Sequence, residues 1–388
     1  MRAQRLQGLG ASVFSKMDDL KNELQEQGKS LINLSIGSPD RAPSAEIRNV
    51  LGQAALDGNQ YGYTLTRGTK EFRESCAKWY KNRFEVNLDP EHEVLPLMGS
   101  QDGLAHIFLA LIDPGDSAFI PDPGYPIYTA GLVIAGGEKI PLPLSAENDF
   151  LPDLDAIDPD VAGTAKMMVL NYPNNPTAAV APLEFFDEVV KFAKTYDLIV
   201  CHDVAYSELA YDGYRPVSFL QAEGAKKVGV EFHSLSKTFN FAGARLGFVV
   251  GNAEVIEALC ELKSNIDYGI FAPVLKAGSY ALSVRQPQVE ETRQTYQKRR
   301  DILIEGFAEA GWKIPAPKGS MFLWAPVPTH QDSLTFATDL AREAGVIVVP
   351  GVGFGDHGEG FVRIALVQEE EILREAVTRV QEFLRTKD

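Results

Sequence analysis

The stretch from His233 to Phe248 places two serines, a lysine and an arginine together between two apolar runs. A lysine amine becomes an effective nucleophile toward a carbonyl when burial or a nearby cation lowers its pKa, and Arg245 follows Lys237 by eight residues. The same arginine can hold a phosphate through its planar fork of donors, with the hydroxyls of Ser234 and Ser236 as further donors. A solvated lysine in a turn is the alternative interpretation of this stretch.

Polar or aromatic side chains also follow four other predicted strands. In an open parallel α/β sheet, ligands bind outside the carboxyl ends of the strands, so these residues are candidates for one shared site. The candidates are Ser100, Gln101 and Asp102 after 94–98, Tyr125 after 118–121, Asn175 after 166–170, and Asp203 and Tyr206 after 198–202. Each has an ordinary explanation alone, such as a cap or a turn, but together with Lys237 they predict a site.

This set of side chains matches an aromatic phosphorylated aldehyde. Ser100, Gln101 and Asp102 open a predicted helix, whose free backbone N–H groups suit a phosphate. Tyr125 supplies a ring for stacking, and the amine and the acid come from Lys237 and Asp203. Pyridoxal phosphate fits best, because its chemistry needs a lysine Schiff base and an acid paired with the ring nitrogen. No metal site is expected.

The elements that position these residues alternate between helix and strand, which predicts an α/β fold with a mostly parallel sheet sandwiched by helices. Predicted helices cover 15–27, 45–56, 69–84, 101–112, 182–196 and 253–264, and predicted strands cover 94–98, 118–121, 166–170, 198–202, 228–232 and 246–250. From residue 283 the pattern changes to a long polar helix over 287–310, a helix over 334–344, and strands over 322–327, 346–349 and 361–366.

This change of pattern predicts two domains. Residues 45–282 would form the large domain that binds the cofactor. Residues 1–44 and 283–388 would together form a smaller α+β domain, so that both termini pack in one unit.

Composition excludes several classes of protein. The chain has 37 Lys+Arg against 53 Asp+Glu, and its net charge of −16 would repel a nucleic acid. Cys76, Cys201 and Cys260 fit neither a disulfide framework nor a Cys-x-x-Cys metal site. Residues 1–6 lack the apolar stretch of a signal peptide, and no run approaches the roughly 20 apolar residues that span a bilayer. We expect a cytoplasmic protein that binds neither nucleic acid nor membrane.

The motifs resemble the fold-type I pyridoxal-phosphate enzymes, specifically the class I and II aminotransferases, over nearly the whole chain. The resemblance rests on Ser-Leu-Ser-Lys at 234–237 with Arg245 eight residues later, Asn-Pro-Thr at 175–177, Asp203 with Tyr206, and the late Arg363. Two positions depart from the family pattern, since Ala178 stands where glycine is usual and Ala244 where tryptophan is frequent. Neither change removes a reacting group, so they concern the loop shape and the substrate pocket.

The resemblance implies a role for each candidate. Lys237 would carry the cofactor and move a proton, and Arg363 would hold the substrate α-carboxylate with help from Asn175 and the Gly37 backbone. The expected cofactor contacts are Asp203 at the ring nitrogen, Asn175 and Tyr206 at the ring 3′ oxygen, Tyr125 on the ring face, and Ser100, Gln101, Asp102, Ser234, Ser236 and Arg245 around the phosphate. Tyr63 would reach the phosphate of the neighbouring subunit, which implies a homodimer with shared active sites.

The substrate is predicted from residues 263–273, where aspartate-specific relatives supply an arginine. This stretch holds Asp267 and no arginine, and an acid suits the ammonium of a zwitterionic far end such as that of LL-diaminopimelate. The stretches 78–84, 99–106 and 263–267 also look like the diaminopimelate aminotransferase branch. The hypothesis is transamination between LL-diaminopimelate and 2-oxoglutarate. The alternatives are an aspartate or broad-specificity aminotransferase, a pyridoxal-phosphate lyase, and a transcription regulator, for which the chain has no spare basic module.

Overall fold

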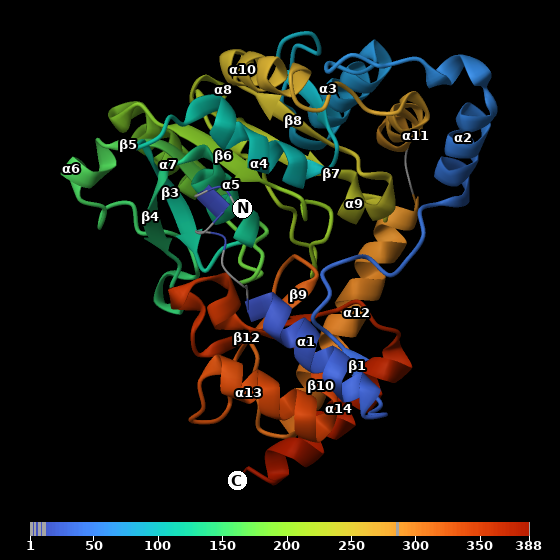
Figure 1. Cartoon of the computed structure of the whole chain (residues 1–388), viewed down its shortest axis with the longest axis vertical. Coiled ribbons are helices and arrows are strands. Elements are labelled where there is room, and N and C mark those ends of the chain that lie inside the picture. The colour runs from blue at the N-terminus through green and yellow to red at the C-terminus, as the bar shows by residue number, and fades with distance from the viewer. Residues whose placement is uncertain (1–2, 4, 7–8, 10–12, 285–286, 388) are drawn as a thin grey trace.

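The computed structural model describes residues 3, 5–6, 9, 13–284 and 287–387, arranged in two lobes (Figure 1). The blue α1 (Val13–Glu26) lies in the smaller lobe beside the orange and red C-terminal elements, whereas the mark for the N-terminus lies over the larger lobe (Figure 1). Part of the start on which the signal-peptide expectation rests, residues 1–2 and 4, lies outside the described residues. The boundaries 1–44, 45–282 and 283–388 stay predictions.

A seven-stranded sheet forms the centre of the larger lobe, in the order β2-β8-β7-β6-β5-β3-β4. Its strands are β2 (Val94–Leu97), β3 (Ser117–Asp122), β4 (Glu138–Pro143), β5 (Ala165–Asn171), β6 (Ile199–Asp203), β7 (Gly229–Ser234) and β8 (Gly247–Gly251). β8 runs antiparallel to both neighbours, whereas β3 to β7 are parallel, so β2 points the same way as β7. The predicted α/β fold with a mostly parallel sheet is confirmed, and the residues after β2, β3, β5, β6 and β7 emerge at one edge.

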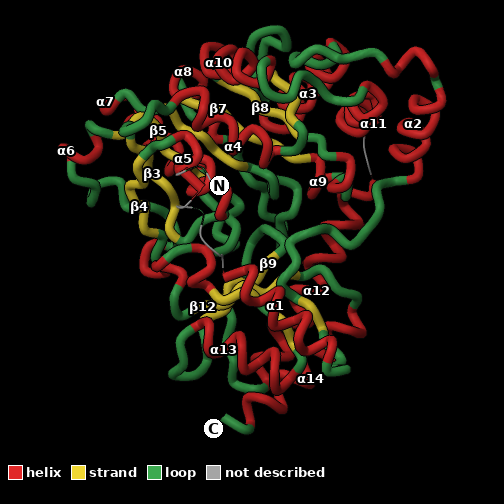
Figure 2. The backbone as a smooth tube through the Cα atoms, in the orientation of Figure 1, coloured by secondary structure: helices red, strands yellow, loops and turns green. Residues whose placement is uncertain are grey.

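Helices cover both faces of this sheet, as the layers in Figure 2 show. One face packs against α4 (Ser100–Leu111), α5 (Pro126–Ala135) and α10 (Ala253–Ser264). The other packs against α2 (Ala45–Leu56), α3 (Lys70–Phe84), α7 (Leu183–Tyr196), α8 (Ala225–Val228) and α11 (Ala272–Ser283). Successive residues of β5 belong to opposite cores, Met167 to the first and Met168 to the second, which explains why the strands are apolar throughout.

The smaller lobe combines a three-stranded antiparallel sheet with helices from both ends of the chain. The sheet has the order β11-β12-β9, with β9 (Phe322–Pro326), β11 (Val349–Pro350) and β12 (Phe361–Ala365). β1 (Ile32–Asn33) pairs in parallel with β10 (Val346–Ile347), and α1, α12 (Pro287–Glu309), α13 (Ser333–Asp339) and α14 (Glu370–Arg385) complete the lobe. Ala205 and Tyr206 join its apolar core, so the segment after β6 ties the lobes together.

The sequence analysis did not predict the short helices α6 (Pro159–Ala162), α8 and α9 (Leu235–Thr238), and three longer elements also escaped it, each for a physical reason. α5 is apolar on nearly all sides and shows no stripe, and its Gly131 lies so close to Phe108 that a Cβ there would be 2.7 Å from the ring. β4 is an edge strand with charged residues and two prolines, which weaken a strand pattern. α11 contains Gly278, where a Cβ would be 2.3 Å from Leu246, so a small residue is needed for close packing. Among the described residues, no helix combines the length and apolar character needed to cross a bilayer.

Candidate active site

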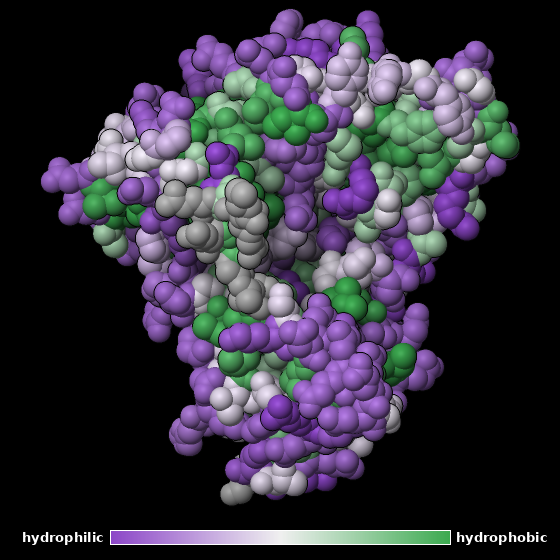
Figure 3. Space-filling model, in the orientation of Figure 1, coloured by the Kyte–Doolittle hydropathy of each residue, from purple (hydrophilic) through white to green (hydrophobic). Residues whose placement is uncertain are grey.

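A cavity of about 510 Å³ lies between the lobes, and the surface is visibly hollowed there (Figure 3). Twelve predicted site residues line it: Gly37, Ser100, Gln101, Tyr125, Asn175, Asp203, Tyr206, Ser234, Ser236, Lys237, Arg245 and Arg363. Gly37 and Arg363 come from segments of the smaller lobe, and the others from the ends of the strands in the larger sheet. The structure therefore brings together residues up to 326 positions apart in the sequence, from Gly37 to Arg363.

Lys237 lies in α9 (Leu235–Thr238), the single helical turn directly after β7. Its Nζ donates a hydrogen bond to the Gly37 carbonyl oxygen at 2.7 Å. Burial, with the positive charges of Arg363 and Arg245, lowers the pKa of Lys237 to about 8, although Asp203 opposes this. A sizeable fraction of the amine is therefore neutral near pH 7 to 8, as a nucleophile or a base requires, and the solvated-lysine alternative does not describe this residue.

Asp203 ends β6, and the two oxygens of its carboxylate have different surroundings. Oδ2 accepts a hydrogen bond from the buried Tyr128 hydroxyl at 2.8 Å. Oδ1 is buried and meets no hydrogen-bond donor within the described chain. Burial raises the pKa of Asp203 to about 6, opposed by the Tyr128 hydrogen bond and the charge of His202. A ligand that brings an N–H to Oδ1 would satisfy the unpartnered oxygen.

An anion site is formed by the start of α4 and the exposed Arg245. Gly99 is the N-cap of α4, so the free N–H groups of the first turn lie where Ser100 and Gln101 line the cavity. Gly99 has φ +82°, and a Cβ there would lie 2.6 Å from the Arg245 guanidinium. Gly247 lets β8 approach the same turn, because a Cβ there would lie 2.8 Å from Ser100 N. Ser234 and Ser236 complete this side, with Ser236 N donating to Ser234 Oγ at 3.2 Å.

Two tyrosines lie on the cavity wall near Asp203. Tyr125, the N-cap of α5, donates its hydroxyl to Gln101 Oε1 at 3.0 Å and packs edge-on against Tyr128. Tyr206 is buried and packs edge-on against Phe322, and burial raises its pKa. Both rings are therefore held in fixed orientations, which suits contacts with a flat aromatic ligand.

Arg363 of β12 points into the cavity from the smaller lobe. Its Nη1 donates to Asn175 Oδ1 at 2.9 Å and its Nη2 to the Ser35 carbonyl oxygen at 2.8 Å. The guanidinium lies 4.2 Å from the ring centre of Phe322 and 4.8 Å from that of Phe354, and burial lowers its pKa to about 10. A buried guanidinium oriented in this way is a receptor for a carboxylate.

The loop after β5 holds Asn175 in place beside Asp203. Asn171 Nδ2 donates to the Asp203 carbonyl oxygen at 2.7 Å, and Asn175 N donates to Asn171 Oδ1 at 2.7 Å. The Asn175–Pro176 peptide bond is cis, and Asn174 bridges the same turn through Thr177. The predicted turn is thus rigid, and it fixes the amide of Asn175 against Arg363.

Two predicted ligand contacts receive a different role from the structure. Asp102 does not line the cavity, because its Oδ2 accepts hydrogen bonds from Met98 N at 3.0 Å and Lys263 Nζ at 2.5 Å. A carboxylate would repel an anion, so this position does not support Asp102 in the phosphate cradle, and that contact stays a prediction. Asp267 also lies away from the cavity, with its Oδ2 2.5 Å from Lys263 Nζ. Its predicted contact with the far end of a substrate has no support within one chain.

Tyr63 stands apart from the cavity as well. Its ring is 92% exposed and packs edge-on against Tyr268 at a centroid distance of 5.6 Å. Its predicted contact with a second subunit stays a prediction.

The residues that shape the site but were missed by the sequence analysis include Phe14, Ser35, Phe322 and Tyr128. Tyr128 lies three residues after Tyr125, a spacing that makes them neighbours on a helix, and recognising α5 would have found it. Phe14, Ser35 and Phe322 carry no chemical signature, and only the approach of the smaller lobe brings them to the cavity.

A family model described as aminotransferase class I and II matches residues 29–380. The chain belongs to this family. It is 49% identical over 382 residues to an LL-diaminopimelate aminotransferase of Moorella thermoacetica, covering 98% of each chain. It is also 49% identical over 383 residues to an LL-diaminopimelate aminotransferase of Syntrophobacter fumaroxidans, covering 99% of each. A substrate-bound structure of BacF from Bacillus subtilis superimposes with a TM-score of 0.95 at 38% identity, covering 98% of this chain and 97% of that one.

The family membership agrees with the chemistry of the cavity. Class I and II aminotransferases depend in general on pyridoxal phosphate and exchange the amino group of an amino acid with a 2-oxo acid. The protein is therefore an aminotransferase, as the sequence predicted. The predicted resemblance to the diaminopimelate aminotransferase branch is confirmed by the 49% sequence identity to two of its members.

Proposed function

We propose that this aminotransferase transfers an amino group between LL-diaminopimelate and 2-oxoglutarate, with pyridoxal phosphate held in the cavity of a homodimer. The substrate assignment rests on the 49% identity, over nearly the full length of each chain, to two relatives named LL-diaminopimelate aminotransferase. The aspartate alternative has the weaker support of a 28% identity to an aspartate aminotransferase structure from Thermus thermophilus, at a TM-score of 0.90.

The cavity residues fit the cofactor in three independent respects. The unpartnered Oδ1 of Asp203 is an acceptor for a protonated ring nitrogen. The start of α4 and Arg245 form a receptor for a phosphate. Lys237 supplies a partly neutral amine in the same cavity. On this fit, Tyr125 would stack on the ring, and Asn175 and Tyr206 would contact its 3′ oxygen.

When bound, pyridoxal phosphate supplies an aldehyde that takes up an amino group and a ring that withdraws electrons from the substrate Cα. Asp203 would keep a proton on the ring nitrogen, because its carboxylate is ionised above a pKa of about 6 and offers a free oxygen. Lys237 Nζ would take the proton from the substrate Cα and deliver it to the carbon that was the cofactor aldehyde, which its lowered pKa of about 8 allows near neutral pH.

Substrate binding is assigned to the smaller lobe. Arg363 receives the α-carboxylate shared by the amino acid and the 2-oxo acid, and Asn175 keeps the guanidinium in place. Ser35 accepts a hydrogen bond from Arg363, and Gly37 accepts one from Lys237. The 35–38 segment therefore lies over both side chains and limits the access of water to them.

A panel of amino donors with 2-oxoglutarate tests the substrate. LL-diaminopimelate should give the highest kcat/KM, above aspartate, alanine and the aromatic amino acids. Efficient turnover of aspartate beside negligible turnover of LL-diaminopimelate would overturn the substrate proposal and leave the reaction type intact. Formation of pyruvate and ammonia from a cysteine conjugate, without glutamate, would instead indicate a lyase.

A second experiment tests Lys237 and the cofactor together. Borohydride should fix added pyridoxal phosphate to the protein and leave it on one peptide that contains Lys237. The Lys237→Ala variant should retain no reduced cofactor on that peptide, while Lys298→Met, a change on the exposed face of α12, should behave like the unaltered protein. Labelling of the Lys237→Ala protein at the same level would refute the assignment.

The homodimer is supported by an exposed apolar surface near Tyr63. Leu56, Tyr61 and Leu65 are 81%, 65% and 68% exposed, and Tyr61 packs against Phe271 as Tyr63 packs against Tyr268. Apolar surface is also visible over α2 and α11 at the upper right of Figure 3. Such a surface is unfavourable in a monomer. Analytical ultracentrifugation should find dimers that Leu65→Asp dissociates, and a monomer at all concentrations would contradict this part. The cytoplasmic location stays a prediction.

A further inference from the structure

A buried ion cluster, which the proposed reaction does not use, lies under the start of α4. Lys263, in the last turn of α10, is 3% exposed, and its Nζ lies 2.5 Å from Asp102 Oδ2 and 2.5 Å from Asp267 Oδ2. His106, one turn after Asp102 on α4, has its Nδ1 2.8 Å from Asp102 Oδ1. Removing one member of a buried ion pair leaves an uncompensated charge. Because Lys263 contacts both carboxylates, the cluster of Asp102, His106 and Asp267 depends on its positive charge.

On one side, the cluster supports the anion site. Asp102 is two residues after Ser100, and its Oδ2 also accepts a hydrogen bond from Met98 N, just before the N-cap of α4. Burial would raise the pKa of Asp102, but the His106 hydrogen bond and the charge of Lys263 lower it to about 2. The carboxylate is therefore ionised within one helical turn of the proposed phosphate contacts. Lys263 compensates this negative charge, which would otherwise disfavour an anion there.

On the other side, the cluster holds the loop 265–271. The backbone N–H groups of Asp267 and Tyr268 donate to the Lys263 carbonyl oxygen at 3.0 and 3.2 Å. The loop is also fitted against Thr64, whose hydroxyl donates to the Ile270 carbonyl oxygen, and a Cβ at Gly269 would clash with the Thr64 backbone at 2.1 Å. Tyr268, on this loop, carries the ring that packs against Tyr63.

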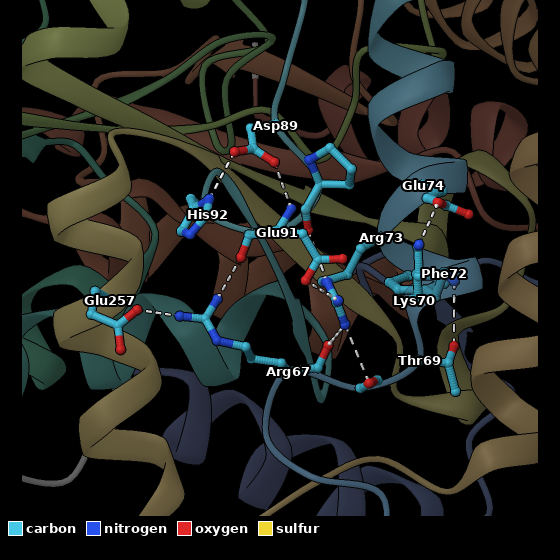
Figure 4. Close-up of polar contacts among 12 residues, drawn as sticks. Arg67, Thr69, Lys70, Phe72, Arg73, Glu74, Asp89, Glu91, His92 and Glu257 are labelled. Carbon is cyan, nitrogen blue, oxygen red and sulfur yellow. Dashed lines mark hydrogen bonds and ion pairs between the residues drawn. The ribbon is translucent and has the colours of Figure 1, made fainter.

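The segment that follows Tyr63 is itself anchored, as Figure 4 shows. Arg73 donates to the Arg67 carbonyl oxygen at 2.9 Å and to Glu91 Oε2 at 2.8 Å. Arg67 in turn bonds Glu257 of α10, the helix that also carries Lys263. The exposed rings near Tyr63 are therefore connected through rigid contacts to α10, and through Lys263 to α4.

A divalent cation is the other candidate for this cluster, because ligand atoms of Asp102, His106 and Asp267 lie within 4.8 Å of one another. The Lys263 ammonium already lies within hydrogen-bonding distance of both carboxylates. A cation at the same place would meet that positive charge, so the arrangement favours a structural ion cluster.

We propose that Lys263 is a positioning residue that couples the anion site at the start of α4 to a subunit contact made by the loop 265–271. The proposal rests on the proposed function, because it takes the cofactor phosphate as the anion and a second copy of the chain as the partner. Coupling between two sites is reciprocal. In this coupling, dimer formation strengthens cofactor binding at each site, and two bound cofactors strengthen the dimer by the square of that factor.

The test measures the dimer dissociation constant by analytical ultracentrifugation, with and without saturating pyridoxal phosphate. The unaltered protein should form a dimer at least about fivefold tighter with the cofactor, the lower end of typical coupling. Lys263→Met and Asp267→Ala should each reduce this change to less than about twofold on the same scale. Lys298→Met, which removes an exposed lysine paired with Glu370, should keep the full change.

The two variants separate the effect of the cluster on the anion site from its effect on the loop 265–271. Asp267→Ala leaves the Lys263–Asp102 pair, so its cofactor affinity as a monomer should match that of the unaltered monomer, whereas Lys263→Met should weaken it. If Lys263→Met does not fold, Asp267→Ala, whose side chain is 14% exposed, decides the test. Full coupling in the folded variants would overturn the inference, as would an unaltered dimer insensitive to the cofactor, while the proposed function stands in both cases. Failure of the unaltered protein to bind pyridoxal phosphate would overturn both.

Discussion

The Tyr128 hydroxyl donates a 2.8 Å hydrogen bond to Asp203 Oδ2 in a fully buried position, and leaves Oδ1 as the oxygen without a partner. The tyrosine therefore decides which carboxylate oxygen faces the cavity. It also lowers the pKa of Asp203 against the larger effect of burial, which raises it. The carboxylate is thus ionised near neutral pH although it is buried.

This pair predicts the effect of Tyr128→Phe, which removes the hydroxyl and keeps the ring. The pKa of Asp203 should rise above about 6, because burial would be opposed by fewer interactions. Since the ionised carboxylate binds the protonated ring nitrogen, the pH below which cofactor affinity falls should move upward. Titration of cofactor binding by absorbance between pH 5 and 9 measures this shift. An unchanged midpoint would contradict the role of the hydroxyl, and Asp203→Asn should lack this midpoint altogether.

A second prediction concerns the stability of the cofactor-free protein. The folded pKa of Asp203, about 6, lies above its ordinary value of 3.8, so the folded state binds the proton more tightly than the unfolded state does. The stability associated with this group is present at low pH and is lost as the pH rises through about 6. Asp203→Asn should therefore raise the free energy of unfolding at pH 8 by roughly 2 to 3 kcal/mol, and by little near pH 4. Denaturant unfolding at both pH values checks this, and equal effects would contradict it.

Arg363→Lys should weaken the binding of both substrates. The lysine keeps the charge but cannot make the paired N–H contacts, and the lost hydrogen bonds to charged groups are worth about 2 to 3 kcal/mol. The KM values of the amino acid and the 2-oxo acid should rise together by about 30- to 150-fold. Arg379→Lys, on the outer surface of the smaller lobe, is the matched control and should leave both KM values unchanged. A change confined to one substrate would argue against a shared carboxylate receptor.

Gly99→Ala should weaken cofactor binding by distorting the anion site. Gly99 has φ +82°, and a Cβ there would lie 2.6 Å from Arg245 Nη2, so the guanidinium would have to move. Backbone strain adds a cost of about 1 kcal/mol or more. The dissociation constant of pyridoxal phosphate should increase about tenfold, measured by fluorescence quenching. Gly52→Ala is the control, because no atom lies within 4 Å of the added methyl in α2. Equal affinities for the two variants would contradict the assignment.

Sequence patterns were sufficient for much of the larger lobe. Helices α2 and α10 begin and end where the periodicity places them, because each has an apolar stripe and a capping side chain, Ser44 and Asn252. The Ser-Leu-Ser-Lys motif and the residues after each strand also indicated the proposed catalytic lysine and the residues that share its cavity. These signals are local, since they depend on spacing along one segment or on the edge at which parallel strands end.

Asp102 and Asp267 show what local signals leave out. Both are themselves predicted ligand contacts, and both are bound to Lys263, a partner that packing alone brings within 2.5 Å. The antiparallel direction of β8 and the buried face of α5 were likewise outside the reach of sequence periodicity. Pairing direction and apolar packing depend on segments that are distant in sequence.

The amino-acid sequence by itself determined the reacting groups of this protein: a lysine after β7, an acid at the end of β6, and arginines at 245 and 363. The tertiary structure decided what those groups can do. Burial and neighbouring charges lower the pKa of Lys237 and raise that of Asp203, and contacts across the lobes orient Arg363. The reason is physical, because residue types are written in the chain, whereas desolvation and orientation arise only when distant segments enclose the same cavity.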